Sequence, residues 1–88
     1  MRTVTTKNGS YNVNYAWAPL MDGSCEICMN DTRLLSQIAP EFEGLDAIHF
    51  VDTDTGEYDY LGYTVLSGIN RDSRGVHVKL IKEVNPNA

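Results

Sequence analysis

Alternation of apolar and polar residues dominates the chain and predicts strands. From Tyr11 to Trp17 every second residue is apolar or aromatic, the pattern of a strand with one buried face. The segment 2–6 is rich in β-branched threonine, and the Asn8-Gly9 pair between the two segments is a strong signal for a hairpin turn. The chain is therefore expected to open with a hairpin whose second strand ends at Pro19, because proline cannot donate to a sheet.

One segment has helical rather than strand spacing. Its apolar positions within residues 31–43 are Leu34, Leu35, Ile38 and Phe42. Asn30 or Asp31 is suited to the N-cap position. Pro40 disfavours helical geometry at Ala39, so we expect a short helix that ends near Ala39, followed by a second turn or a loop over residues 40–43. Gly44 then closes the segment as a C-cap residue.

The remaining segments again have strand spacing. Residues 24–29 alternate, with Cys25, Ile27 and Met29 on one face. Three further strands are expected over residues 46–51, 58–66 and 76–82. Gly62 predicts a bulge or bend in the second of these, and Val76, Val78 and Leu80 are expected to face inward in the third. The order βββ-α-βββ predicts an α+β fold, with a single antiparallel sheet or partly open barrel of five to six strands and one short helix.

Size and composition limit the possible functions. The 88 residues are expected to form a single domain, 1–88, with residues 85–88 as a frayed tail. The net charge of −5 disfavours direct binding to nucleic acid or to an anionic membrane surface. The N-terminus lacks an apolar signal core, and no apolar run approaches the roughly 18 residues of a membrane span. We therefore expect a cytoplasmic protein with reduced cysteines.

Cys25 and Cys28 have the C-x-x-C spacing of zinc and redox sites, and His49 or His77 could supply further zinc ligands. Residues three apart on a regular strand point to opposite faces, which would turn Cys25 inward and Cys28 outward. Our interpretation is a pair of ordinary cysteines without metal or cofactor. A small zinc-stabilised module remains an alternative.

Two other kinds of chemistry find little support in the sequence. The segment 52–56 is similar to the start of a calcium loop, but glycine occupies its fifth position rather than its sixth, and Tyr63 stands at its twelfth. A polar hairpin turn explains the same residues. The chain also lacks a glycine-rich phosphate loop, a nucleophile elbow and an H-E-x-x-H motif, so we do not expect an enzyme.

The distribution of charge is more informative than its sum. Residues 34–70 contain no lysine or arginine and carry −7, while the rest of the chain carries +2. Tyrosines alternate with acids in this interval, a combination common at protein interfaces. The candidate partner-binding residues are Glu41, Glu43, Asp52, Asp54, Glu57, Tyr58, Asp59 and Tyr60. The alternative interpretation is a solvated face that keeps a small protein soluble.

Part of the chain also resembles known proteins. The residues that carry this resemblance span about half of the chain: Phe42-Glu43-Gly44, Gly62-Tyr63-Thr64-Val65-Leu66-Ser67-Gly68-Ile69 and Val76-His77-Val78-Lys79-Leu80. They resemble small uncharacterised proteins of prophages and related mobile elements. Small size, negative charge and the lack of catalytic motifs are similar to anti-CRISPR proteins and other phage-encoded inhibitors of host nucleases.

The leading hypothesis is a small non-catalytic inhibitor. Its acidic, tyrosine-containing hairpin would occupy a basic, nucleic-acid-handling surface of a larger host protein, an arrangement in which electrostatic complementarity speeds association and selects partners. If the chain is phage-encoded, the compartment would be the cytoplasm of the bacterial host. A phage structural or assembly accessory protein that self-associates is the second hypothesis, and the zinc-stabilised module is the third.

Overall fold

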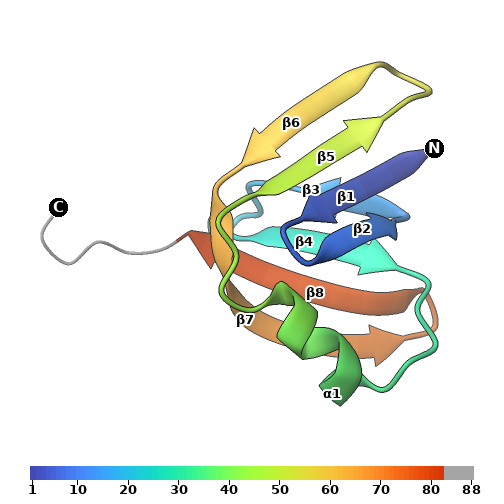
Figure 1. Ribbon diagram of the computed structural model, residues 1–88, viewed down its shortest axis with the longest axis vertical. Coiled ribbons are helices and arrows are strands. Elements are labelled where there is room, and N and C mark those ends of the chain that lie inside the picture. The colour runs from blue at the N-terminus through green and yellow to red at the C-terminus, as the bar shows by residue number, and fades with distance from the viewer. Residues whose placement is uncertain (83–88) are drawn as a thin grey trace, which may run out of the picture.

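The computed structural model describes residues 1–82, which form two antiparallel sheets and a short helical segment (Figure 1). The strands are β1 (Arg2–Thr6), β2 (Gly9–Asn12), β3 (Tyr15–Trp17), β4 (Cys25–Met29), β5 (Ile48–Asp52), β6 (Glu57–Leu61), β7 (Tyr63–Asp72) and β8 (Gly75–Lys82). The helical segment consists of α1 (Leu35–Ile38) and the 3₁₀ helix η1 (Ala39–Phe42). The predicted frayed tail, residues 85–88, lies outside the described residues.

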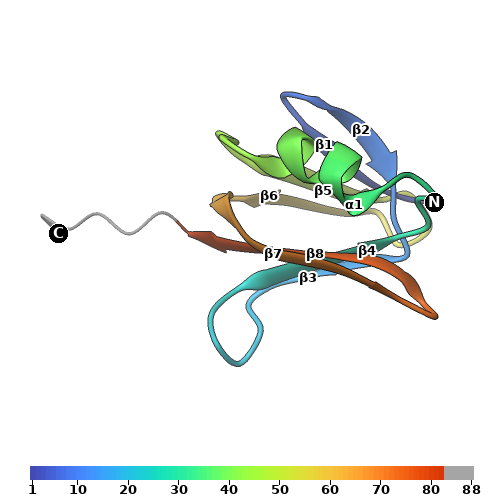
Figure 2. The same ribbon diagram turned by 90° about the horizontal axis from the view of Figure 1, so that it is seen from below.

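The α+β class is confirmed, but the single sheet of five to six strands is not. Within residues 1–82 the strands form two four-stranded sheets, with the orders β2-β1-β5-β6 and β3-β4-β8-β7. Figure 2 shows the two sheets on opposite sides of the molecule, with α1 on the side of the first. The core lies between them, since the fully buried side chains Val4 and Ile48 belong to the first sheet, and Ile27, Val78 and Leu80 to the second.

The chain passes from one sheet to the other between β2 and β3. The Val13 N–H donates to the Arg2 carbonyl of β1 at 3.0 Å, and the next N–H, from Asn14, donates to the Cys28 carbonyl of β4 at 2.7 Å. Consecutive residues are therefore bonded to different sheets. The predicted strand over residues 11–17 is consequently two short strands that meet at a corner.

This corner changes which side chains face inward. Tyr11 and Val13 pack on the core before it, whereas Ala16 and Ala18 do so after it. The alternation has shifted by one position, so Trp17 is 61% exposed. The prediction that Trp17 lies on the buried face is wrong, because that prediction assumed one uninterrupted strand.

The second passage between the sheets occurs at Gly62, which separates β6 of the first sheet from β7 of the second. The expected bend at this glycine is confirmed. Strand β7 then pairs with β8 along its length, with register shifts near Leu66. As predicted, Val76, Val78 and Leu80 are buried.

The helical segment is short, as Pro40 predicts. The α-helix ends at Ile38 and η1 follows, with Pro40 in its first turn and both Ile38 and Phe42 fully buried. The predicted cap is wrong, because the N-cap is Leu34, whose N–H donates to the side chain of Gln37 at 3.1 Å. Gly44 follows η1 with a φ of 64°, the left-handed conformation expected after a helix end.

Candidate functional site

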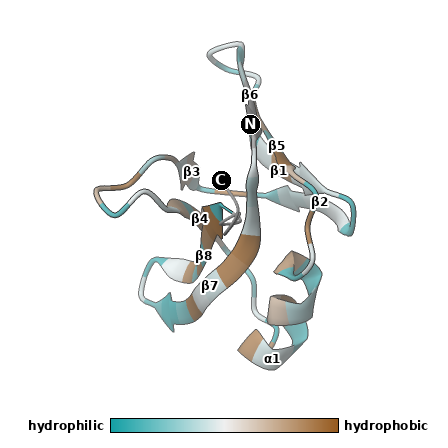
Figure 3. Ribbon diagram, turned by 90° about the vertical axis from the view of Figure 1, so that its left-hand side faces the viewer, coloured by the Kyte–Doolittle hydropathy of each residue, from teal (hydrophilic) through white to brown (hydrophobic). Residues whose placement is uncertain are grey.

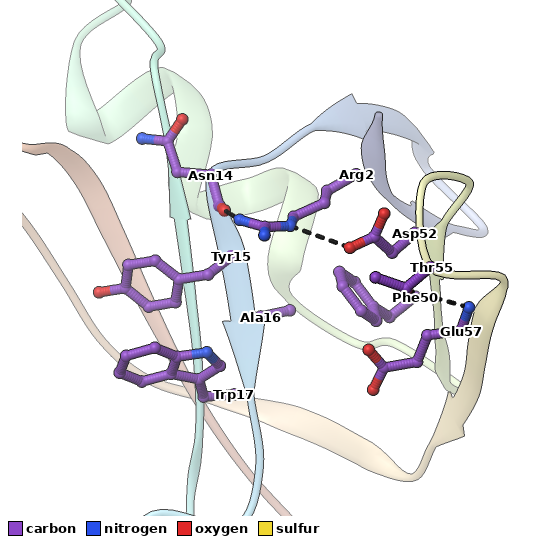
Figure 4. Close-up of a pocket in the computed structure, with 9 residues that line it drawn as sticks. All are labelled: Arg2, Asn14, Tyr15, Ala16, Trp17, Phe50, Asp52, Thr55 and Glu57. Carbon is purple, nitrogen blue, oxygen red and sulfur yellow. Dashed lines mark hydrogen bonds and ion pairs between the residues drawn. The ribbon is translucent and has the colours of Figure 1, made fainter.

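A groove of about 380 Å³ opens between β3 and the β5–β6 hairpin. Figure 4 shows the residues that line it: Arg2, Asn14, Tyr15, Ala16, Trp17, Phe50, Asp52, Thr55 and Glu57. They come from β1, from Asn14 between β2 and β3, from β3 itself, and from the β5–β6 hairpin. Since these segments belong to both sheets, the groove depends on the passage of the chain from β2 to β3.

Strand geometry decides which side chains enter the groove. In Figure 4, Ala16 points toward Phe50, whereas the Tyr15 and Trp17 rings point to the other side of β3. Across the groove, Glu57 is paired directly with Asp52 and so shares a sheet face with Asp52 and Phe50. Its carboxylate points into the groove from the hairpin (Figure 4). The floor is thus apolar, and one wall carries a carboxylate.

Arg2 and Asp52 hold one end of the groove together. Arg2 Nε donates to Asp52 Oδ2 at 3.1 Å, and Arg2 Nη1 donates to the Asn14 carbonyl at 2.6 Å. Asp52 is 4% exposed and also accepts the N–H of Asp54 at 3.0 Å. The Arg2 guanidinium lowers the pKa of Asp52, which stays ionised at neutral pH. This predicted partner-binding residue therefore links β1 to the hairpin rather than facing a partner.

The eight predicted site residues do not form one surface. Glu41 lies in η1, where Arg33 pairs with it at 2.6 Å and the Tyr11 hydroxyl donates to it at 3.0 Å. The hydrogen bond from Arg33 has the larger effect and the one from Tyr11 the smaller, and both lower the pKa of Glu41. Glu43 is exposed at the C-cap of η1. Both residues belong to the helical segment and not to the hairpin.

The β5–β6 hairpin itself has two different faces. Asp54, in its turn, is 83% exposed in its side chain and pairs with the N-terminal ammonium at 2.9 Å. Glu57 is exposed on the groove side. Tyr58 is also exposed, but it lies on the opposite face, where its hydroxyl is 2.7 Å from His49 Nδ1. The side chains of the two other predicted residues, Asp59 and Tyr60, lie outside the described residues.

The sequence analysis did not include the loop between β3 and β4, residues 18–24, among the candidate binding residues. This loop projects from the sheets (Figure 3), and Met21 within it is fully exposed. Trp17, in the strand that precedes the loop, is also exposed. The loop is held by two backbone hydrogen bonds, from the Leu20 N–H to the Ser24 carbonyl at 2.8 Å and from the Gly23 N–H to the Leu20 carbonyl at 2.9 Å. The Lys79–Asp22 ion pair at 2.5 Å also ties it to β8. In the sequence, the feature that points to an exposed apolar turn here is Pro19 shortly after the aromatic residues Tyr15 and Trp17.

The cysteines do not form a pair. Cys25 is fully buried in the core, whereas Cys28 is on the other face of β4, as predicted. On this face Cys28 is only 1% exposed, because the Asn14 side chain and the Arg74 carbonyl lie 3.7 Å from its sulfur. Burial raises the pKa of the Cys25 thiol to about 12. Among the residues whose side chains the structure describes, 1–58 and 62–82, no group of three potential metal ligands lies together.

His77 is part of a polar network on the outer face of the second sheet. Its Nε2 is 2.8 Å from Asp72 Oδ1, and its Nδ1 is 3.4 Å from the Tyr15 hydroxyl, which donates to Glu26 at 2.5 Å. The Cys28 thiol, which lies opposite His77 in the pairing of β4 with β8, donates instead to the Arg74 carbonyl. Both ring nitrogens face other groups, so the arrangement lacks the thiol–imidazole contact that activates a nucleophile. The network ties β3, β4 and β8 together across the sheet.

Comparisons with family models, curated proteins and solved structures find no match to the chain. Within residues 1–82, no helix has the length and apolar character needed to cross a membrane.

Proposed function

We propose that the chain is a small non-catalytic protein-binding inhibitor of the anti-CRISPR type, which occupies a basic, nucleic-acid-handling surface of a larger host protein. The groove beside the β5–β6 hairpin is the observation that carries this proposal. Its lining includes two carboxylates and one guanidinium, and so has a formal charge of −1. The neighbouring Asp54 adds a further exposed carboxylate. A surface of this kind favours a cationic partner and disfavours phosphate.

The structure narrows the residues to which this role is assigned. Asp52 is buried and Glu41 is half-buried, and both pair with arginines of the chain. Asp54 and Glu57 are exposed, so we assign the acidic part of the proposed interface to them, although Asp54 also pairs with the N-terminal ammonium. Trp17, on β3 beside the groove, is added because exposed tryptophans often dominate binding energy. We further interpret the two sheets as a partly open barrel, with the groove on its open side.

The test compares two double charge reversals. Asp54→Lys with Glu57→Lys alters the hairpin, and Glu43→Lys with Asp46→Lys makes the same charge change at exposed positions away from it. Immobilised wild type and variants are used to capture proteins from the lysate of the source organism, with mass spectrometric identification. The proposal predicts a basic partner that the hairpin variant loses and the control variant retains. Equal capture by both variants would contradict it.

A phage structural or assembly accessory protein that self-associates is the second candidate. The exposed Trp17 at the end of β3 and Met21 in the following loop favour it, since exposed apolar side chains suit self-association. This candidate predicts an oligomer in analytical ultracentrifugation that resists salt and is lost in Trp17→Ser with Met21→Ser. A monomer at all concentrations would exclude it. The positions of Cys25 and Cys28 on opposite faces of β4 disfavour a zinc-stabilised module that uses both thiols.

A further inference from the structure

We infer that the exposed side of the Trp17 indole binds an arginine side chain of the partner, with the guanidinium stacked flat on the ring. This inference rests on the proposed function and adds to it the kind of group that the partner presents. The site lies on the outer face of the second sheet, because the Tyr15 and Trp17 rings point away from the groove (Figure 4). Its ligand surface is an aromatic ring and not a carboxylate.

Trp17 and Tyr15 form an aromatic stack on β3. They are two residues apart in the strand, so their side chains share one face of the sheet. Their ring centroids are 4.5 Å apart and the ring planes are 31° from parallel, so Tyr15 covers one side of the indole. Because Trp17 is nevertheless 61% exposed, the other side of its ring faces solvent.

Hydrogen bonds to Tyr15 hold the stack in place. The Tyr15 hydroxyl donates to Glu26 Oε2 on the neighbouring strand at 2.5 Å and lies 3.4 Å from His77 Nδ1. Burial and the Glu26 carboxylate raise the pKa of Tyr15, so its hydroxyl keeps its proton and this hydrogen bond. A ring that is already fixed loses little conformational freedom when a ligand stacks on it.

The surroundings of the indole favour a cation over a neutral or anionic ligand. The face of an indole carries partial negative charge and attracts cations more strongly than the other aromatic side chains do. Glu26 is the direct cross-strand neighbour of Trp17, and the hydrogen bond from the neutral Tyr15 hydroxyl leaves its negative charge in place. Lys79, the next residue across the sheet, is paired with Asp22 at 2.5 Å. The field at the ring therefore adds to the attraction for a cation.

Arginine suits this site better than lysine. A guanidinium is planar and stacks on an aromatic ring, and it is more weakly hydrated than an ammonium, so it loses less solvation when it leaves water. Arginine is also common on surfaces that hold nucleic acid, the kind of surface that the proposed partner presents.

The experiment uses blocked tetra-arginine, tetra-lysine and tetra-citrulline peptides as probes. Citrulline has the length and the planar end of arginine without its charge. Binding to the full chain is followed in ¹⁵N–¹H spectra through the backbone amides and the indole N–H of Trp17, the only tryptophan. Stacking is detected as nuclear Overhauser contacts between the arginine δ-methylene protons and the indole ring.

Three variants accompany the wild type. Trp17→Leu removes the ring but keeps an apolar side chain, and Trp17→Phe keeps a smaller ring. Leu34→Ala is the matched control, because Leu34 is 64% exposed, close to the 61% of Trp17, and lies before α1 outside the proposed interface. Thermal melts of the control and the wild type are expected to coincide.

Tetra-arginine is expected to shift the indole N–H and to give the Overhauser contacts. Trp17→Leu is expected to weaken its affinity about two- to fivefold, the value of an exposed cation–ring contact, with Trp17→Phe between it and the wild type. Leu34→Ala should bind as the wild type does.

Unchanged affinity in Trp17→Leu, missing Overhauser contacts, or equal binding of tetra-citrulline or tetra-lysine would overturn the arginine inference and leave the proposed acidic interface intact. The same holds if no cationic peptide binds while capture of the partner still depends on hairpin charge. If no cationic peptide binds and capture is also insensitive to hairpin charge, both proposals fail.

Discussion

Replacing Gly75 with alanine tests the packing of the second sheet. Gly75 begins β8 with a φ of 129°, a conformation that side chains rarely adopt. Because Met29 pairs with Val76, Gly75 lies against the end of β4. An added Cβ would be 2.5 Å from the Met29 carbonyl oxygen and 3.2 Å from the Asn30 side-chain oxygen.

The expected loss in the free energy of unfolding has two parts. Forcing alanine into this backbone region costs about 1–3 kcal/mol. Relieving a contact with a backbone carbonyl requires a shift of β4 or β8, and overpacking of this kind typically costs about 1–3 kcal/mol. Gly75→Ala should therefore destabilise the protein by about 2–6 kcal/mol, a large share of the stability expected for a small domain.

Urea unfolding followed by far-ultraviolet circular dichroism measures this loss as a lower midpoint at unchanged m-value. Gly68→Ala is the matched control, because Gly68 lies in β7 with no atom within 4 Å of an added Cβ and no positive φ. The control should change stability by no more than about 1 kcal/mol. If Gly75→Ala is as stable as Gly68→Ala, the described approach of β8 to the end of β4 is wrong.

Three further predictions concern the core, the ion pairs and the thiols. Phe42→Ala should lower the free energy of unfolding by about 3–5 kcal/mol in urea, because Phe42 is fully buried. Arg33 lowers the pKa values of Asp31 and Glu41. The stability that these shifts supply is present above pH of about 4.5 and is lost as pH falls through the folded-state values, so Arg33→Gln should reduce the urea midpoint at pH 7 and flatten its decline between pH 5 and 2. Cys25 should resist iodoacetamide at pH 8 in the native protein and react only after unfolding, as read by mass spectrometry, because burial raises its pKa to about 12.

Each of these has a contrary result. A loss below about 1 kcal/mol in Phe42→Ala would mean that the helical segment does not close the core. An unchanged pH profile in Arg33→Gln would mean that Arg33 does not stabilise the ionised carboxylates. Rapid native alkylation of Cys25 would mean that β4 is not buried in solution.

Local patterns predicted most of the elements because the physics of those elements is local. The helix shortened by Pro40 and the bend at Gly62 follow from backbone conformations that those residues favour or forbid. The first hairpin also forms, but its turn is at Lys7 and Asn8, because Gly9 is already paired with Thr6 in β2. The corner at Val13 and Asn14 could not be predicted in this way. Neither residue is a glycine or proline, and the change of sheet is defined only by hydrogen bonds to strands elsewhere in the chain.

The candidate site was predicted only in part for the same reason, because local patterns do not show which distant residues come into contact. Counting charges along the chain located the acidic interval, but it could not show that Asp52 pairs with Arg2 across fifty positions. It also treated Glu57 and Tyr58 as one surface, whereas neighbouring strand residues face opposite sides. Trp17 was placed on the buried face because the prediction assumed one continuous strand and did not include the change of sheet at Val13 and Asn14. The groove exists only after two sheets are assembled, so no single segment predicts it.

The most direct test of the binding account is the affinity of the purified partner, once captured, for three proteins at several salt concentrations. These are the wild type, Asp54→Lys with Glu57→Lys, and Glu43→Lys with Asp46→Lys. The account predicts that wild-type affinity falls with salt, that the hairpin variant binds at least about 100-fold more weakly, and that the control stays within about threefold. A salt-insensitive affinity that both variants share with the wild type would contradict it.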